Sequence, residues 1–180
     1  MNDEIKFRIA VVTLSDRAAA GERADESGKV IREMISALNC EIIAQEVMPD
    51  DAGMLSSRLV ELADDAHADL VLTTGGTGLG ARDVTPEATL SVIDQRVLGI
   101  EEAMRTAGIA QTPYAMLSRA VAGVRGRTLI INLTGSPKGV KENLAVVLPV
   151  LPHALNLLRA ARVPDHDHQF SPPSSEGTSA

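Results

Sequence analysis

The chain has 180 residues, of which 44% are hydrophobic but only 2% aromatic, so aliphatic side chains must fill the core of what we expect to be one domain. The formal net charge of −7 and the scarcity of aromatic rings argue against a nucleic-acid-binding surface. The single cysteine, Cys40, excludes a disulfide framework and is expected to be a small core residue. The N-terminus is unlike a signal peptide, and no run approaches the roughly twenty apolar residues of a membrane helix, so we expect a cytoplasmic protein without membrane contact.

Strand and helix patterns alternate along the chain. The β-branched run at 7–14 is typical of a strand buried on both faces, and apolar residues within 25–39 recur at helical spacing. The next predicted elements are, in order, a strand at 40–48, a helix at 54–67, a strand at 68–74, a helix at 86–95, a strand at 127–133 and a helix from 137 to 148.

Prolines and caps set the expected ends of several helices. Thr85 is predicted to cap a helix whose first residue is Pro86. Pro149 and Pro152 are expected to kink the last helix. The segment 97–127 is less regular, and we expect short helices there and a small hairpin or subdomain near AVAGVRG (120–126).

This alternation predicts a three-layer α/β/α sandwich with a mostly parallel sheet. We expect the domain to cover residues 1–163. Residues 164–180 are rich in Pro, Ser and His, which predicts a disordered tail.

Polar residues and glycines follow four of the predicted strands. In a parallel sheet these positions meet at the carboxyl edge, where ligands bind. Any one of these groups could be an ordinary turn, because turns use Gly, Pro, Asp and Ser. Their coincidence at one edge favours a binding site. The four groups are Ser15-Asp16-Arg17, Pro49-Asp50-Asp51, Gly75-Gly76-Thr77-Gly78 and Thr134-Gly135-Ser136-Pro137-Lys138.

The third group opens a loop with four glycines in six residues. Gly76, Gly78 and Ala81 match the dinucleotide pattern G-x-G-x-x-A, but the predicted helix begins only after the motif and the strand before it is the third, which disfavours that function. Consecutive glycines can instead turn several N–H groups toward an anion. Ser136, as the expected cap of a helix, marks a second anion-binding position.

Carboxylates close to phosphate groups indicate a bridging Mg²⁺, which prefers one or two carboxylates together with phosphate oxygens. Asp83, Asp50 and Asp16 are the candidates, although each could be a helix cap or a solvated turn residue. Arg82 could pair with a phosphate or with Asp83. Lys138 could neutralise charge on a transferring phosphoryl group or lie solvated at a helix start.

Other chemistries fit poorly. His67 precedes a strand at the opposite edge of the sheet, so a Ser-His-Asp triad has no well-placed base. His166 and His168 belong to the predicted tail, and no zinc-ligand spacing is present.

The run TTGGTGLGARDVTPEAT at 73–89 resembles the signature of the molybdopterin-binding domain family, which includes small MogA/MoaB-type proteins. The segments TLSDRAAAGERADESG, VMPDD, AMLSRAVAGVRGRTLIINLTGSPKGVKENL and VLPVLPHAL resemble further family segments in family order. The similarity covers roughly residues 7–158. One departure is Thr134, where the family commonly has proline.

The resemblance implies a three-layer fold, typically a homotrimer, with molybdopterin adenylyltransferase activity. ATP and Mg²⁺ would adenylylate the terminal phosphate of molybdopterin and release pyrophosphate, and the product would pass to a molybdate-inserting partner protein. Asp50 and Asp83 would be the catalytic and metal-binding aspartates.

The alternatives are a non-catalytic carrier or scaffold of the same superfamily and a different nucleotidyltransferase; the presence of both aspartates favours the enzyme. Whether molybdenum or tungsten is the eventual metal stays open. The expected substrate-binding residues are Thr13, Ser15, Asp16, Gly75, Gly76, Thr77, Gly78, Arg82, Thr85, Ser118, Asn132, Gly135, Ser136, Pro137 and Lys138.

Overall fold

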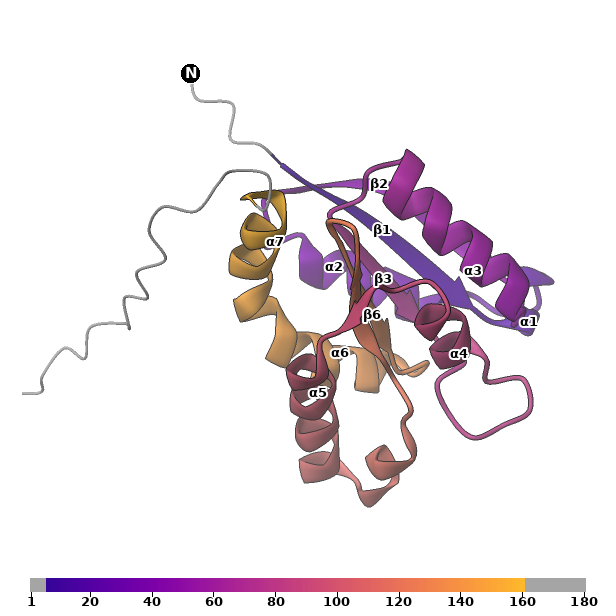
Figure 1. Ribbon diagram of the computed structural model, residues 1–180. Coiled ribbons are helices and arrows are strands. Elements are labelled where there is room, and N and C mark those ends of the chain that lie inside the picture. Colours follow the sequence, from indigo (N-terminus) through magenta and orange to yellow (C-terminus); the bar gives the residue numbers. More distant parts are fainter. Residues whose placement is uncertain (1–5, 161–180) are drawn as a thin grey trace, which may run out of the picture.

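A computed structural model describes residues 6–160 and shows a six-stranded sheet with the order β2-β1-β3-β6-β5-β4 (Figure 1). The first four strands in this order are parallel, whereas β5 is antiparallel to both β6 and β4. The predicted tail at 164–180 lies outside the described residues. The strands are β1 (Phe7–Leu14), β2 (Cys40–Met48), β3 (Leu70–Thr74), β4 (Gln95–Arg96), β5 (Ala122–Arg125) and β6 (Thr128–Leu133).

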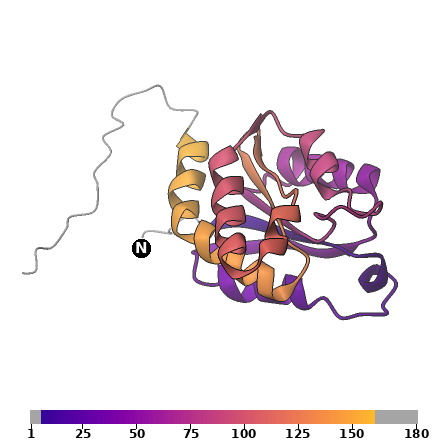
Figure 2. The same ribbon diagram turned by 90° about the horizontal axis from the view of Figure 1, so that it is seen from below.

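Helices connect the strands and cover both faces of the sheet (Figure 2). The α-helices are α1 (Asp16–Ala19), α2 (Glu26–Ile35), α3 (Ala52–Val60), α4 (Thr85–Leu90), α5 (Leu98–Gln111), α6 (Pro137–Val147) and α7 (Leu151–Ala160). Shorter helical turns are the π-helical η1 (Glu61–Asp65) and the 3-10 segments η2 (Pro113–Leu117) and η3 (Leu148–Val150).

The central strands have apolar side chains on both faces, because successive residues of a strand point to opposite sides. Ile9 and Val11 of β1 join the core cluster under α2, α5, α6 and α7, whereas Ala10 and Val12 join the cluster under α3 and α4. All residues of β3 and β6 are buried. The predicted three-layer α/β/α sandwich with a mostly parallel sheet is therefore confirmed.

Several local predictions need correction. Val84, not Thr85, is the N-cap of α4; Thr85 is the first helical residue, and its hydroxyl donates a hydrogen bond to the carbonyl of Gly75. The segment expected to contain short helices holds the 14-residue helix α5. The apolar residues of this segment show little helical periodicity, because Met104 is the only large apolar side chain of α5 that is buried. The expected hairpin is present as β5–β6, and Pro149 lies in the 3-10 turn that separates α6 from α7.

The helical run Pro137–Ala160 is long and apolar enough to cross a membrane by length and composition, which the sequence expectation overlooked. This run is α6, η3 and α7 in succession. Leu144, Leu151 and Leu155 belong to the core cluster over the sheet, so part of the apolar surface packs within the domain. Such a run is weak evidence for a membrane segment, since core helices share this composition.

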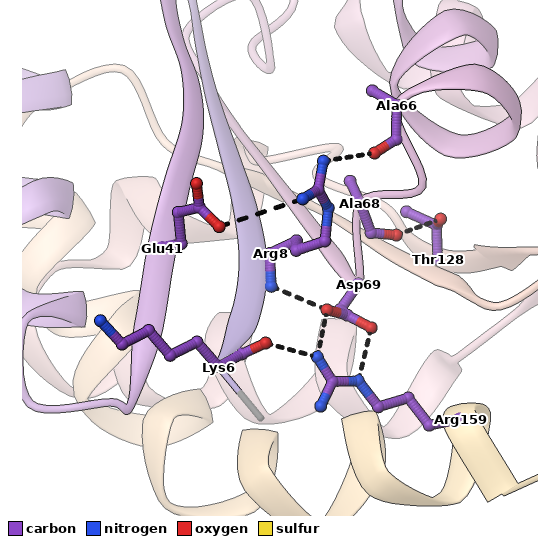
Figure 3. Close-up of polar contacts among 8 residues, drawn as sticks. All are labelled: Lys6, Arg8, Glu41, Ala66, Ala68, Asp69, Thr128 and Arg159. Carbon is purple, nitrogen blue, oxygen red and sulfur yellow. Dashed lines mark hydrogen bonds and ion pairs between the residues drawn. The ribbon is translucent and has the colours of Figure 1, made fainter. Parts of the chain in front are cut away.

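A partly buried ion pair connects α7 to the amino end of the sheet (Figure 3). The guanidinium of Arg159 donates to both carboxylate oxygens of Asp69 at 2.8 and 2.7 Å, and it lies 4.6 Å from the centre of the Phe7 ring. The Arg8 amide donates to the same carboxylate at 2.7 Å. Burial raises the pKa of Asp69, but the hydrogen bonds from Arg159 and Arg8 outweigh it, so the net pKa lies below the usual value.

We predict that Arg159→Ala lowers the free energy of unfolding by about 2–4 kcal/mol, because it leaves a buried carboxylate without its partner. Because the pKa of Asp69 is lower in the folded than in the unfolded protein, its ionised form stabilises the fold at pH values above the unfolded pKa of about 3.9. This contribution disappears as the pH falls through the folded-state pKa. In urea denaturation, the free energy of unfolding of Arg159→Ala should therefore be lower than that of wild type at pH 7, and the difference should become smaller below pH ~4. Glu41→Gln, which removes only the exposed 3.9 Å pair with Arg8, is the control and should change little. An equal loss in both variants would contradict this role.

Candidate active site at the carboxyl edge

Glycines allow three strand ends to meet at the carboxyl edge of the sheet. Gly75 follows β3 with a φ of +96°, and a Cβ at this position would lie 2.2 Å from the carbonyl oxygen of Leu14 at the end of β1. A Cβ on Gly135, which follows β6, would lie 3.2 Å from the Cα of Gly75. Gly76, with a φ of +62°, then turns the chain away from the sheet beside Asp50. In Figure 1 the tip of β1 and the β3–α4 loop lie at the same end of the sheet.

Asp16, Asp50 and Arg82 connect three of the predicted loops. The Asp16 amide donates to the Asp50 carboxylate, and the Asp50 amide donates to the Asp16 carboxylate, both at 3.0 Å. Arg82 donates to the two carboxylate oxygens of Asp16 at 3.0 and 2.8 Å. The protein partner of Arg82 is therefore Asp16 and not the expected Asp83.

The pKa values of the two aspartates move in opposite directions. The Arg82 hydrogen bonds, with a smaller effect from the Asp50 amide, hold the pKa of Asp16 below its usual range. Burial raises the pKa of Asp50; the Asp16 amide opposes this, while the nearby carboxylates of Asp16 and Asp83 add to it. Asp50 is thus a partly buried carboxyl that carries its negative charge at a cost, and a cation bound nearby would reduce this cost.

Asp83 is held by the glycine loop, which we define as residues 75–84. The Gly80 amide donates to Oδ2 of Asp83 at 2.7 Å, and the Asp83 amide donates back to the Gly80 carbonyl at 2.9 Å. A Cβ on Gly78 or Gly80 would approach Oδ2 of Asp83 to 2.9 Å, so glycine at these positions leaves room for the carboxylate. Among residues 6–160, Oδ1 of Asp83 has no hydrogen-bond partner.

The carboxylates suit a cation that shares its coordination with a substrate. Within residues 6–160 no group of three or more His, Cys, Asp and Glu side chains is arranged to hold a metal ion by itself. Asp83 nevertheless lies close enough to Asp50 for its charge to raise the pKa of Asp50. One or two carboxylates supplemented by phosphate oxygens are a typical Mg²⁺ environment, so these residues fit that ion.

Three cavities open along this edge. One, of about 360 Å³, lies between the glycine loop, Ser118 and Ser136. A second, of about 240 Å³, continues between α5 and α6 and includes Lys138. The third, of about 180 Å³, lies beside β1 and is bordered by Thr13, Ser15, Arg23, Asp25, Gly75 and Gly135. Most of the predicted substrate-binding residues therefore border connected or neighbouring spaces.

The start of α6 forms one wall of two of these cavities. Ser136 is the N-cap, as predicted, and its Oγ accepts a hydrogen bond from the Gly139 amide at 3.1 Å. Pro137 occupies the first turn, and the largely exposed Lys138 lies 3.7 Å from Glu142. The helix therefore presents its N-terminal N–H groups toward the cavities, a suitable arrangement for an anion.

Some predicted site residues have structural partners, and two of them are fully buried. Asn132 is fully buried, and its side-chain amide donates to the hydroxyls of Thr73 and Thr89, both at 2.9 Å. Thr85 is also fully buried. Ser15 caps α1, accepting from the Ala18 amide. Within the structure these residues shape the edge of the sheet.

Sequence reasoning missed other residues at this edge. Asp25 caps α2 and accepts a 2.8 Å hydrogen bond from the Thr13 hydroxyl. Arg119, directly after Ser118, contacts the glycine loop at several points. The sequence contains no signal for either contact apart from the neighbouring motif residues.

The family model described as a probable molybdopterin binding domain matches residues 10–153. The chain therefore belongs to the molybdopterin-binding domain family, as the motifs indicated. A protein of Helicobacter pylori strain J99 named molybdopterin adenylyltransferase is 41% identical over 154 residues, which cover 84% of this chain and 88% of the relative.

Solved structures agree with this assignment. The crystal structure of the molybdopterin biosynthesis enzyme MoaB from Thermus thermophilus is 52% identical, with a TM-score of 0.80 over 84% of this chain and 96% of that one. The tungsten cofactor synthesizing protein MoaB from Pyrococcus furiosus is 35% identical, with a TM-score of 0.78 over 86% of this chain and 98% of that one.

We predict that Gly75→Ala destabilises the fold by about 3 kcal/mol or more, because the new methyl group meets the fixed Leu14 carbonyl in addition to the strain of a positive φ. Gly126→Ala is the matched control, since Gly126 also has a positive φ, of +56°, but faces open space. It should cost only about 1 kcal/mol. Thermal or urea unfolding measures both, and equal costs would show that the contact with Leu14 is unimportant.

Proposed function

We propose that this chain is a Mg²⁺-dependent molybdopterin adenylyltransferase that transfers AMP from ATP to the terminal phosphate of molybdopterin. The proposal is carried by the convergence of the glycine loop, Asp50, Asp83 and the N-terminus of α6 at one edge of the sheet. The family membership and the name of the H. pylori relative support it.

The reaction needs positioning and charge stabilisation more than covalent help from the protein. An oxygen of the pterin's terminal phosphate attacks the α-phosphorus of ATP and forms a new P–O–P bond. The bond between the α-phosphorus and its bridging oxygen breaks, and pyrophosphate leaves with the electron pair. Both substrates are polyanions, so their phosphates must be brought together against their mutual repulsion.

Each part of the edge has a role in this proposal. The glycine loop anchors one substrate through its backbone N–H groups, and Ser136 with Lys138 anchors the other. Asp50 and Asp83 would be the residues that hold Mg²⁺ beside the substrate phosphates. When bound, this ion would neutralise charge on the phosphate oxygens during transfer.

The same proposal includes the cellular setting. We place the protein in the cytoplasm, bound neither to a membrane nor to nucleic acid, where it passes adenylylated molybdopterin to a molybdate-inserting partner protein. The single cysteine and the net charge of −7 support this setting. The eventual metal, molybdenum or tungsten, is left open because the similar structures include a tungsten-cofactor protein.

We propose further that the chain forms a homotrimer, as the family resemblance implies. Large apolar side chains are exposed on η2 and on the glycine loop, including Tyr114, Met116 and Leu79. Association would remove such side chains from water. Sedimentation equilibrium should give three times the chain mass of 19.0 kDa, and a single-chain mass at micromolar concentration would contradict the trimer.

We predict that Asp83→Asn lowers adenylyl transfer about 100-fold or more without loss of folding, because it removes a charge from the reacting centre. The asparagine side-chain oxygen can still accept from the Gly80 amide, so the loop geometry should survive. The purified protein is incubated with molybdopterin, ATP and Mg²⁺, and adenylylated pterin and pyrophosphate are quantified. Asp65→Asn, an exposed change on η1 at the other end of the sheet, is the matched control.

The outcomes separate the possible functions. Product that disappears without Mg²⁺ or in Asp83→Asn supports the proposal. Near-normal turnover of Asp83→Asn would remove Asp83 from the mechanism. Tight molybdopterin binding by the wild-type protein without product would indicate a carrier or scaffold.

A further inference from the structure

Arg119 lies in the segment between η2 and β5, and it contacts both ends of the glycine loop. Its amide donates to the Thr77 carbonyl at 2.9 Å. Its side chain donates from Nε to the Gly78 carbonyl and from Nη2 to the Asp83 carbonyl, both at 2.7 Å. The remaining nitrogen, Nη1, pairs with Glu87 on α4.

Apart from the Arg119 contacts, the part of the loop between them is held by the Arg82–Asp16 pair and by the hydrogen bonds between Gly80 and Asp83. Leu79, Gly80, Ala81 and Arg82 are exposed, so no buried apolar side chain anchors this stretch to the core. Only polar contacts remain to fix its shape, and the orientation of the Asp83 carboxylate follows from that shape. A rigid guanidinium that bonds to carbonyls at positions 78 and 83 closes the loop into a ring.

We infer that Arg119 is a positioning residue that sets the geometry of Asp83 by clamping the glycine loop. Its three side-chain nitrogens already have protein partners, so it acts through the loop and not as a phosphate ligand. The effect on catalysis rests on the proposed adenylyl transfer, whereas the clamp itself is a property of the fold.

The planar fork distinguishes this role from a purely electrostatic one. Lysine keeps the charge but has one nitrogen, which cannot reach two carbonyls and a carboxylate in fixed directions. If Arg119 served only as a positive charge, Arg119→Lys would rescue function. If Arg119 is a clamp, Arg119→Lys should lose nearly as much function as Arg119→Ala.

The test compares Arg119→Lys with Arg125→Lys. Arg125 also has a fork that is fully engaged, with Asp64 and the Val92 carbonyl, but it lies at the opposite edge of the sheet. Amide exchange followed by NMR uses the amides of Asp83 and Thr85, which donate to the loop carbonyls of Gly80 and Gly76. In Arg119→Lys they should exchange at least about tenfold faster, with no change for β3 amides.

The kinetic measurement is made on the same proteins. In Arg119→Lys, kcat should fall about 100-fold, the loss expected for misplacement of a catalytic group by about 1 Å. The KM for ATP should change much less, because the other contacts with the nucleotide remain. Arg125→Lys should match wild type in both measurements.

Each result decides one question. Wild-type loop exchange and kcat in Arg119→Lys would overturn the clamp, as would equal losses in Arg125→Lys. A lower kcat with unchanged loop exchange would overturn it in favour of direct contact with substrate. If the wild-type protein transfers no adenylyl group, the proposed function fails, and the exchange rates still decide whether Arg119 clamps the loop.

Discussion

The close approach of Gly75 to the Leu14 carbonyl is the contact on which the rest of the carboxyl edge depends. Any side chain at this position would separate the ends of β1 and β3, because its Cβ would lie 2.2 Å from that oxygen. The positive φ values of Gly75 and Gly76 then direct the loop away from the sheet and past Asp50. Backbone contact between strand ends thus brings loops that are distant in sequence to one place.

The strands that are buried on both faces were predictable from the sequence. The central strands β1, β3 and β6 are almost continuously apolar because helices cover both faces of the sheet, and their runs are unmistakable. Helix α5 was not predictable as one helix. Its buried positions include Glu101, which is satisfied by Arg96 and the Ala122 amide, so a charged residue interrupts the apolar period.

The positions of the site residues were predictable, but their partners were not. Motifs at strand ends identify Asp16, Asp50 and Asp83 because topology alone brings such ends together. The pairing of Arg82 with Asp16 joins residues 66 positions apart, and that of Arg119 with Gly78 spans 41. Such pairings depend on side-chain directions after folding. A single sequence therefore indicated where the site lies but not which cationic side chain pairs with which carboxylate.

Several cationic side chains at this edge already have protein partners, and this affects how polyanions can bind. Arg82 is paired with Asp16, Arg119 with loop carbonyls and Glu87, and Lys138 lies near Glu142. The charges of Arg82 and Arg119 are thus largely balanced before a substrate arrives, whereas Lys138 is largely exposed. Attraction for phosphates must then come mainly from backbone N–H groups, the N-terminus of α6 with Lys138, and a cation brought with the nucleotide. The raised pKa of Asp50 fits this view, since a carboxylate without its own arginine gains most from such a cation.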